Sequence, residues 1–481
     1  MKLSLLSVLA VPAAVVAHGD HAARHIYPRQ ASGSSAAASP SASRSSGSAA
    51  APPGSSTAAP VSSPPTVAFS LPSTNPTAVP LSQIVSGASA SPTLGATTAY
   101  PAGASPTFLS NAPGLPDLSK VLPANYPALD KPPPTDSPQV QQWIQDVKNS
   151  GIDIPNIAPT VAGGCPANAQ AAADTSRCWW TCGGCTRDTD VTTCPDKLTW
   201  GLTHDDGPAF YTPNLLQYLD QVQLKTTFFV VGSRVISYPA ILQEEYMSQH
   251  QIAVHTWSHP AMTTLTNEEA IAELGWTKKV IHDVLGVTPQ YWRPPYGDID
   301  DRIRAISRAM NLTPIMWTRI SATSTFDTGD FNIAGGSTSA SQVLANWESI
   351  IGNATGLDTG FIVLEHDLFQ QAVEIATGYI LPAALANQPP LKIEPVVSCL
   401  HKPLGDAYLE TNDNKTNPPV VSGSNPVTLS SGAPGSSEAT GALNNNGGKN
   451  AAVSMQANVG GFMTAAGVSL VALVAGISVF L

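Results

Sequence analysis

Between residues 198 and 364, short apolar runs alternate with stretches of helical pattern. The apolar runs are rich in β-branched and aromatic residues and predict strands at 198–203, 225–231, 251–255, 291–293, 314–317 and 360–364. The stretches between them predict helices at 213–221, 238–250, 267–285, 301–310 and 340–351, and Thr266 and Gly286 fit the two ends of the third helix. This alternation predicts an α/β fold whose mostly parallel sheet closes, or nearly closes, into a barrel.

The composition of the 481-residue chain changes outside this region. Residues 31–115 are nearly all Ser, Ala, Pro, Thr and Gly, and such a segment cannot bury enough apolar surface to offset its ordering entropy. We therefore expect a signal peptide at 1–17, a disordered region at 18–115, a transitional segment at 116–157, a catalytic domain at 158–404, a Ser/Gly/Asn-rich spacer at 405–450 and a removed tail at 451–481. Within the transitional segment, residues 139–149 predict one amphipathic helix that docks on the main domain.

The two ends of the chain predict its location. Residues 3–16 are apolar and follow Met1-Lys2, which is typical of a signal peptide. Residues 462–481 are apolar to the end and follow a polar stretch of small residues, which predicts a GPI-attachment signal at Asn450 or Asn446. An ordinary tail-anchored helix is the alternative. We expect a secreted protein held by a GPI lipid at the plasma membrane and cell wall, with N-glycosylation sequons at Asn311, Asn353 and Asn414.

All six cysteines lie in the predicted catalytic domain, and an even number in an exported chain predicts disulfide bonds. Cys399 is far from the others and is expected to join the end of the domain to its beginning. The spacing of Cys182 and Cys185 leaves half of a zinc knuckle or a redox pair as alternatives. The remaining cysteines are Cys165, Cys178 and Cys194.

Side chains that can bind a cation or move a proton follow four of the predicted strands. The carboxyl ends of parallel strands share one face, where the active sites of such barrels lie. Two adjacent carboxylates and two imidazoles four residues apart are the materials of a divalent-metal site with a spare carboxylate as general base, so the pattern predicts metal-assisted hydrolysis. The residues are Asp205 and Asp206, His255 and His259, Arg293, and Glu365-His366-Asp367.

These motifs also carry a resemblance. The sequences Thr-His-Asp-Asp-Gly-Pro at 203–208, His-Thr-Trp-Ser-His at 255–259, Arg-Pro-Pro-Tyr-Gly-Asp at 293–298 and Ile-Val-Leu-Glu-His-Asp at 362–367 resemble the ordered motifs of the NodB-type polysaccharide deacetylases, carbohydrate esterase family 4. The Cys- and Trp-rich stretch at 178–208 resembles the fungal chitin deacetylases in particular. The resemblance implies a distorted (β/α) barrel that removes acetyl groups from the N-acetylglucosamine units of a polymer.

The resemblance also implies a role for each residue of the motifs. A divalent metal ion, zinc or cobalt, would be bound by Asp206, His255 and His259. Asp205 would be the general base and Arg293 would orient it. The remaining roles are the general acid at His366, the oxyanion contact at the backbone N–H of Tyr296, and a partner for His366 at Asp330.

Some residues depart from the family pattern or allow two interpretations. His204 stands where the family usually has Phe or Tyr, so an extra imidazole is expected beside the site. Asp330 belongs to a weakly matched motif in which Phe331 replaces the common Trp. Five aromatic residues are candidates for stacking on sugar rings, and core packing explains each of them equally well. They are Trp257, Trp292, Tyr296, Trp317 and Phe331.

The net charge of −11 argues against a nucleic-acid or anionic-membrane partner and suits a neutral polymer whose deacetylated product is cationic. Three functions follow from these observations. The first is a wall-associated chitin deacetylase that produces chitosan from chitin in the cell wall. The second is an O-acetyl esterase acting on xylan, and the Cys- and Trp-rich stretch disfavours it. The third is a non-catalytic chitin-binding wall protein, which the intact acid, base and metal set disfavours.

Overall fold

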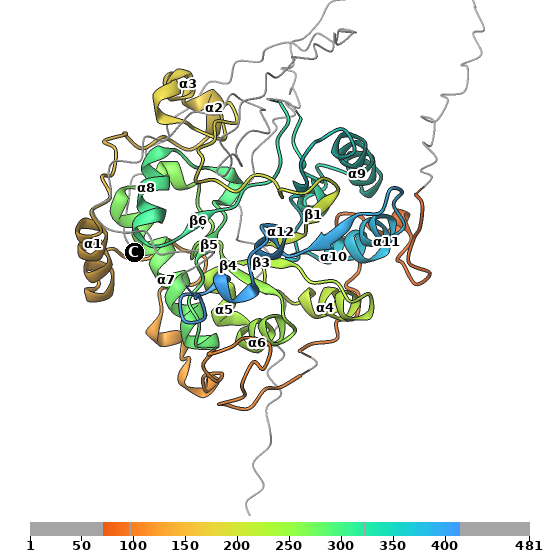
Figure 1. The fold of residues 1–481 in the computed structure, drawn as a ribbon, viewed down its shortest axis with the longest axis horizontal. Helices are drawn as coiled ribbons and strands as arrows, with labels where there is room; N and C mark the ends of the chain where they lie inside the picture. Colours follow the sequence, from red (N-terminus) through yellow and green to blue (C-terminus); the bar gives the residue numbers. More distant parts are fainter. Residues whose placement is uncertain (1–70, 97, 322–323, 414–481) are drawn as a thin grey trace, which may run out of the picture. The chain divides into compact units, whose positions relative to one another are not determined.

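The computed structural model describes residues 71–96, 98–321 and 324–413, and its strands are parallel (Figure 1). Strands β2 (Thr203–Asp205), β3 (Thr227–Val230), β4 (Gln251–Val254), β5 (Tyr291–Trp292) and β6 (Thr313–Pro314) form one sheet in chain order. Strands β7 (Phe361–Ile362), β1 (Thr199–Gly201) and β8 (Lys392–Glu394) form a second, three-stranded sheet with β1 in the middle. The predicted α/β class is confirmed.

Isolated backbone contacts join the two sheets at both edges. Asp205 at the end of β2 forms a parallel bridge with His366, which follows β7. On the other side, the backbone N–H of Thr318, which follows β6, donates to the carbonyl of Ile362 in β7 at 3.0 Å. The strands therefore form a ring that is interrupted at the two joins, which is the distorted barrel that the sequence predicts.

Helices surround the strands. Those that follow the strands are α4 (Thr212–Gln221), α5 (Gly232–Ser237), α6 (Pro239–Met247), α7 (Asn267–Leu285), α8 (Asp301–Ala309) and α9 (Ala340–Ala354). Helix α7 has the predicted bounds because Thr266 and Glu269 form a capping box at its start and Gly286 ends it in the left-handed conformation. Helices α10 (Gln370–Ile375), α11 (Leu381–Leu385) and α12 (Val396–Cys399) close the domain.

The single strand predicted at 198–203 is wrong. The structure divides this region into β1 and β2, which belong to different sheets. The division falls at Leu202, whose backbone N–H donates to Glu394 of β8 while its carbonyl accepts from Thr227 of β3. Such a change of partner depends on strands distant in the chain and leaves no local pattern. Helices α5, α10, α11 and α12 and strand β8 were not predicted either.

Three disulfide bonds pair all six cysteines. The bond Cys194–Cys399 links the segment before β1 to α12, so the prediction for Cys399 is confirmed. The bonds Cys165–Cys182 and Cys178–Cys185 lie in the segment before β1, which also contains helices α2 (Gly164–Ala167) and α3 (Ala169–Ala173). Because Cys182 and Cys185 bond to different partners, the structure does not pair them with each other as a redox disulfide.

The boundary predicted at residue 115 is too late. Within residues 71–115, Ile84, Leu109 and Leu115 are buried in the hydrophobic core, and the hydroxyl of Tyr379 donates to the carbonyl of Val79 at 2.7 Å. A few apolar anchors are therefore enough to hold this Ser- and Pro-rich segment against the domain, although its composition is typical of disorder.

Two hydroxyl side chains within residues 71–115 donate hydrogen bonds to α10 and to the loop before α4. Ser91 donates to Glu374 of α10 at 2.5 Å, and Thr93 donates to the carbonyl of Phe210, just before α4, at 2.6 Å. Residues 91–93 therefore contact the segments that follow β2 and β7.

The predicted docking helix is present as α1 (Pro138–Asn149). It buries Val140, Ile144 and Val147, and its Trp143 ring lies directly on Gly275 of α7. The signal peptide, the sequon at Asn414 and the candidate attachment residues Asn450 and Asn446 lie outside the described residues. In the described part of the chain, no helix has the length and apolarity needed to span a membrane.

Candidate active site

The candidate catalytic side chains leave the carboxyl ends of parallel strands. Asp205 is the last residue of β2 and Asp206 follows it. His255 comes directly after β4, and Arg293 comes directly after β5. Because His366 bridges to Asp205, it joins the same mouth of the barrel from β7. The structure therefore brings together the residues of four sequence motifs.

Asp206, His255 and His259 form a cluster that can hold a cation. One ligand atom from each lies within 4.8 Å of the other two. Nε2 of His259 and Nε2 of His255 lie 3.2 and 3.4 Å from Oδ1 of Asp206. Asp206 and His259 adopt positive φ angles of 80° and 60°, which non-glycine residues hold only where the surrounding structure imposes them.

The protonation states of this cluster suit metal binding. The backbone carbonyl of Arg293 lies 2.8 Å from Nδ1 of His255, so Nδ1 can donate to it while Nε2 faces Asp206. Burial lowers the pKa of His259, which favours the neutral imidazole. Burial opposes the charge of Asp206, but the two histidines outweigh it and hold the pKa of Asp206 well below its usual range. One carboxylate oxygen and two imidazole nitrogens fit a divalent cation with open coordination positions.

Asp205 is held by a different partner. Nη1 of Arg293 donates to Oδ1 of Asp205 at 2.7 Å and to the Thr203 hydroxyl at 3.0 Å. The fully buried guanidinium also lies 4.1 Å from the centre of the Phe229 ring. These contacts fix one oxygen of Asp205 and leave Oδ2 on the side of the metal cluster, 3.8 Å from Nε2 of His255.

His366 forms a close pair with Asp330, the first residue of η8 (Asp330–Ile333). Nδ1 of His366 lies 2.7 Å from Oδ1 of Asp330, and its backbone N–H donates to Oδ2 at 2.8 Å. Burial disfavours the charged imidazole, but the carboxylate beside it outweighs burial and raises the pKa of His366 to about 10. The imidazole is therefore protonated at neutral pH, with Nε2 directed away from Asp330.

Tyr296 lies in the sharp turn η7 (Pro295–Gly297) with a φ angle of 59°. Its ring centre lies 4.7 Å from that of His259, and the residue is 50% exposed. Its backbone N–H has no hydrogen-bond acceptor within the part of the chain that the structure describes. This N–H is therefore free to bind an oxygen atom that enters the mouth.

Of the two interpretations of Trp317, the structure favours core packing over stacking on a sugar ring. Only 6% of Trp317 is exposed, because its ring packs against Trp180 and its Nε1 donates to Thr325. Trp257 and Trp292 are fully buried as well. A face that is covered by protein cannot bind a sugar, so these three residues belong to the core under and around the site.

His204 does not face the site. Successive side chains of a strand point to opposite faces, so His204 points away from the mouth that Asp205 lines. Its Nδ1 lies 3.0 Å from the Thr226 hydroxyl, and its ring packs against Phe228. Burial lowers its pKa to about 3, which keeps the imidazole neutral.

One residue of the site was not predicted from the sequence. Glu273 of α7 is fully buried and holds the loop between the two histidines of the metal cluster. It accepts hydrogen bonds from the backbone N–H groups of Trp257 and Ser258 at 2.7 and 2.8 Å, and from the Ser258 hydroxyl at 2.6 Å. In the sequence, Glu273 is one of several glutamates of a long helix, and nothing local distinguishes it from an exposed one.

Comparisons with known proteins identify a matching family and similar chains. A family model described as Polysaccharide deacetylase matches residues 192–315. Chitin deacetylase 1 of Cryptococcus neoformans var. grubii is 51% identical over 352 residues, which are 72% of this chain and 72% of that protein. Chitin deacetylase of Amylomyces rouxii is 38% identical over 228 residues, which are 42% of this chain and 52% of that protein.

Among solved structures, the chitin deacetylase from Colletotrichum lindemuthianum matches 48% of this chain and 99% of its own, with 22% identity and a TM-score of 0.41. The residues matched by the family model include both aspartates, the two histidines of the metal cluster and Arg293.

Proposed function

The chain belongs to the polysaccharide deacetylase family, and from this premise we propose that it removes the N-acetyl groups of chitin, releasing acetate and leaving chitosan. Two relatives that carry the name chitin deacetylase support this substrate. The observation that carries the proposal is the meeting of three groups in one mouth. These are a carboxylate held by Arg293, a cluster that fits a cation, and the imidazole of His366 paired with a carboxylate.

Asp206, His255 and His259 hold the divalent cation, which we propose to be zinc or cobalt. Their donor set of one carboxylate oxygen and two imidazole nitrogens suits both ions. When bound, the cation supplies Lewis-acid chemistry, because it polarises the acetyl carbonyl and lowers the pKa of water.

Asp205 acts as the general base. An amide is a poor electrophile, so the attacking water must lose its proton as the new C–O bond forms. Oδ2 of Asp205 lies on the metal side and accepts this proton, while Arg293 keeps Oδ1 occupied and holds the carboxylate in place. The backbone N–H of Tyr296 donates to the oxyanion of the tetrahedral intermediate.

His366 acts as the general acid. The glucosamine nitrogen is a poor leaving group as an anion and must be protonated while the C–N bond breaks. With Nδ1 bonded to Asp330, the Nε2–H of His366 is the proton that can be donated. The raised pKa of His366 keeps this proton in place until the amine takes it.

Acetate release tests the proposal. The purified enzyme is given oligomers of N-acetylglucosamine or acetylated xylan, with and without a chelator. We expect acetate from the oligomers only, and loss of release with the chelator that added zinc or cobalt restores. A preference for acetylated xylan would indicate an O-acetyl esterase, and binding of the oligomers without acetate release would indicate a non-catalytic protein.

We further propose that the enzyme is secreted and held by a GPI lipid at the plasma membrane and cell wall, close to its polymer. The support is the apolar segment after Met1-Lys2 and the apolar tail that ends at Leu481. Treatment of intact cells with a phosphatidylinositol-specific phospholipase should release the enzyme into the medium. Retention in the membrane with residues 462–481 still present by mass spectrometry would contradict this location.

A further inference from the structure

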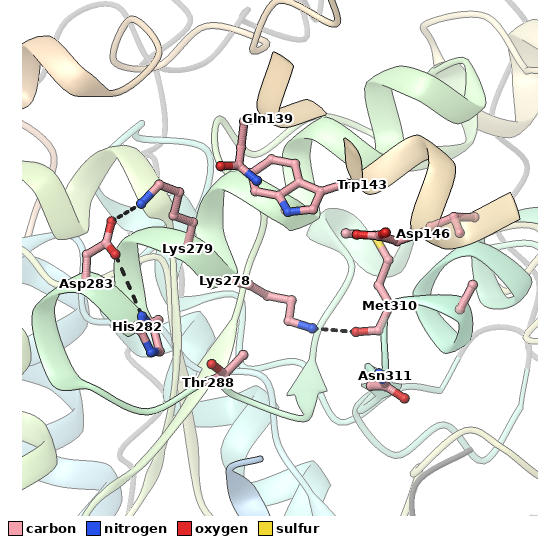
Figure 2. A pocket seen from close by; sticks show the side chains of 13 residues that line it. Gln139, Trp143, Asp146, Lys278, Lys279, His282, Asp283, Thr288, Met310 and Asn311 are labelled. Atoms are coloured by element: carbon pink, nitrogen blue, oxygen red, sulfur yellow. Dashed lines mark hydrogen bonds and ion pairs between the residues drawn. The ribbon is translucent and has the colours of Figure 1, made fainter. Parts of the chain in front are cut away.

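A cavity of about 430 Å³ lies between α1, α7 and the turn that follows α8 (Figure 2). Figure 2 shows Gln139 and Trp143 of α1 on one side and Thr288 and Asn311 on the other. None of the residues that line the cavity belongs to the metal cluster or to the acid and base pairs. Its volume falls within the range of about 300–1,000 Å³ that is usual for small-molecule sites.

Asn311 has a structural role as a helix cap. It follows α8 in the left-handed conformation, with a φ angle of 57°. Its backbone N–H donates to Arg308 at 2.9 Å, and the N–H of Leu312 donates to Ser307 at 2.8 Å, which are the bonds that end a helix. Glycine would serve equally well at this position, so the cap alone requires neither the asparagine side chain nor a threonine two residues later.

Two observations point to a further role for the Asn311 side chain. Asn311-Leu312-Thr313 is an acceptor sequence for N-linked glycans. The side-chain amide of Asn311 makes no hydrogen bond among the described residues, although it lines a cavity with a tryptophan and several polar groups. An amide that is unbonded and opens on such a cavity is available for a covalent sugar.

We propose that Asn311 carries an N-linked glycan whose innermost N-acetylglucosamine occupies this cavity. The sugar has a face of C–H groups that fits an aromatic ring, and hydroxyl and acetamide groups that need polar partners. Trp143 supplies the ring, and Asp146 and Lys278 lie on the same cavity as polar partners. The Trp143 ring is held firmly, because it packs on Gly275 and its centre lies 5.5 Å from the Trp276 ring in an edge contact.

The covalent link to Asn311 favours binding of the sugar in the cavity. A tethered sugar is present at a local concentration on the order of millimolar, so weak contacts are enough to keep it in the cavity. In this position it would connect α1, which belongs to the N-terminal segment, with the turn between α8 and β6. The inference rests on the proposed secretion, since N-glycans are added only to exported chains.

The test uses the full chain secreted from a eukaryotic host. Glycopeptide mass spectrometry measures occupancy at Asn311 and at Asn353, a second sequon on α9 whose amide bonds to Ser349. We expect Asn311 to be occupied. In the native protein, endoglycosidase should cleave its glycan about tenfold more slowly than in the denatured protein, which corresponds to about 1.4 kcal/mol of contact with the cavity.

Variants separate the cavity from the cap. Trp143→Ala should abolish the protection against endoglycosidase. Asp146→Arg should do the same from an exposed position, which keeps the test valid if Trp143→Ala does not fold. Asn311→Gly keeps the left-handed cap and loses the glycan, and Thr313→Val loses the glycan with the asparagine in place. Thr313→Ser should retain the glycan and the protection.

Three results would overturn the proposal. The first is an unmodified Asn311 in the secreted protein, and modification of Asn353 in the same sample would show that secretion itself is not at fault. The second is equal rates of cleavage in the native wild type and in Asp146→Arg. The third is an occupied Asn311 whose glycan is cleaved equally fast in native and denatured protein, together with binding of soluble N-acetylglucosamine oligomers that Asp146→Arg abolishes, which would assign the cavity to the substrate polymer.

Discussion

Replacing Asp330 with asparagine should lower the raised pKa of the His366 imidazole toward the usual value of a histidine. The substitution removes the charge that lies 2.7 Å from Nδ1 and keeps an oxygen that can accept one of the two hydrogen bonds. In the wild type, Asp330 overcomes the burial of His366 and raises its pKa from 6.5 to about 10. At about 1.4 kcal/mol per pH unit, this rise corresponds to about 5 kcal/mol in favour of the protonated imidazole.

The pH dependence of the activity follows from the direction in which the pKa of His366 shifts. A general acid must be protonated, so activity is lost as the pH rises through the pKa of His366. Without Asp330 the largest influence that opposes burial is lost, and Asp206 and Asp205 oppose it less strongly, so the pKa falls toward 6.5 and the alkaline limb of kcat moves down by up to about 3 pH units. A full return to 6.5 would lower the protonated fraction roughly 300-fold at pH 9, which is the upper limit of the loss, whereas at pH 6 the two enzymes should differ only a few-fold.

Acetate release from N-acetylglucosamine oligomers between pH 5 and pH 10 measures this shift. Asp327→Asn is the matched control, because Asp327 is a nearby carboxyl group without a hydrogen bond to His366 and should leave the alkaline limb close to the wild type. His366→Ala supplies the baseline and should lose ~10²–10⁴-fold at every pH. If Asp330→Asn lost the same factor at pH 6 and pH 9, Asp330 would only position His366. If the variant kept wild-type activity at pH 9, His366 would not be the acid.

Three further outcomes follow from the geometry. Asp206→Asn should weaken metal binding, and excess zinc or cobalt should partly restore activity. Asp205→Asn should keep the metal, as measured by mass spectrometry, and stay inactive at any metal concentration. Rescue of Asp205→Asn by metal would contradict its role as base. Glu273→Gln should lower metal affinity about 10–100-fold, with kcat recovering at saturating metal, because the loop between the ligand histidines loses its carboxylate acceptor. Replacing Cys194 and Cys399 together by serine should lower the free energy of unfolding by about 5 kcal/mol, because the disulfide bond between them closes a loop across 205 positions. Denaturant titrations measure this change, and an unchanged unfolding midpoint would refute it.

The parts of the fold that the sequence predicts are those encoded locally. Helix α7 combines an N-cap, a glutamate that completes the capping box and a terminal glycine, and its bounds agree with the structure. The catalytic aspartates and histidines stand at the ends of apolar runs, so the rule for parallel strands was enough to predict that they share a mouth.

The parts that could not be predicted depend on contacts between distant segments. Leu202 separates two sheets because β8 and β3, far apart in the chain, take its N–H and its carbonyl. Glu273 acquires its role only when α7 folds against the loop that it holds, which lies 15 and 16 positions earlier in the chain. Residues 71–115 have the composition of a linker, and the three apolar side chains that become buried stand at irregular spacing among many small residues, so they give no periodic signal.

The hydrogen bonds of Ser91 and Thr93 have a mechanical consequence for the catalytic mouth. Ser91 is bonded to α10, which begins a few residues after His366, and Thr93 is bonded to the segment that follows Asp206. The acid and the metal cluster reach the mouth from β7 and β2, which are joined at this point by a single bridge. Residues 91–93 connect the segments that follow these two strands from outside, so they resist any opening of the barrel at this join. The Ser- and Pro-rich segment thereby restrains the distance between the group that gives the proton and the site where the substrate is attacked.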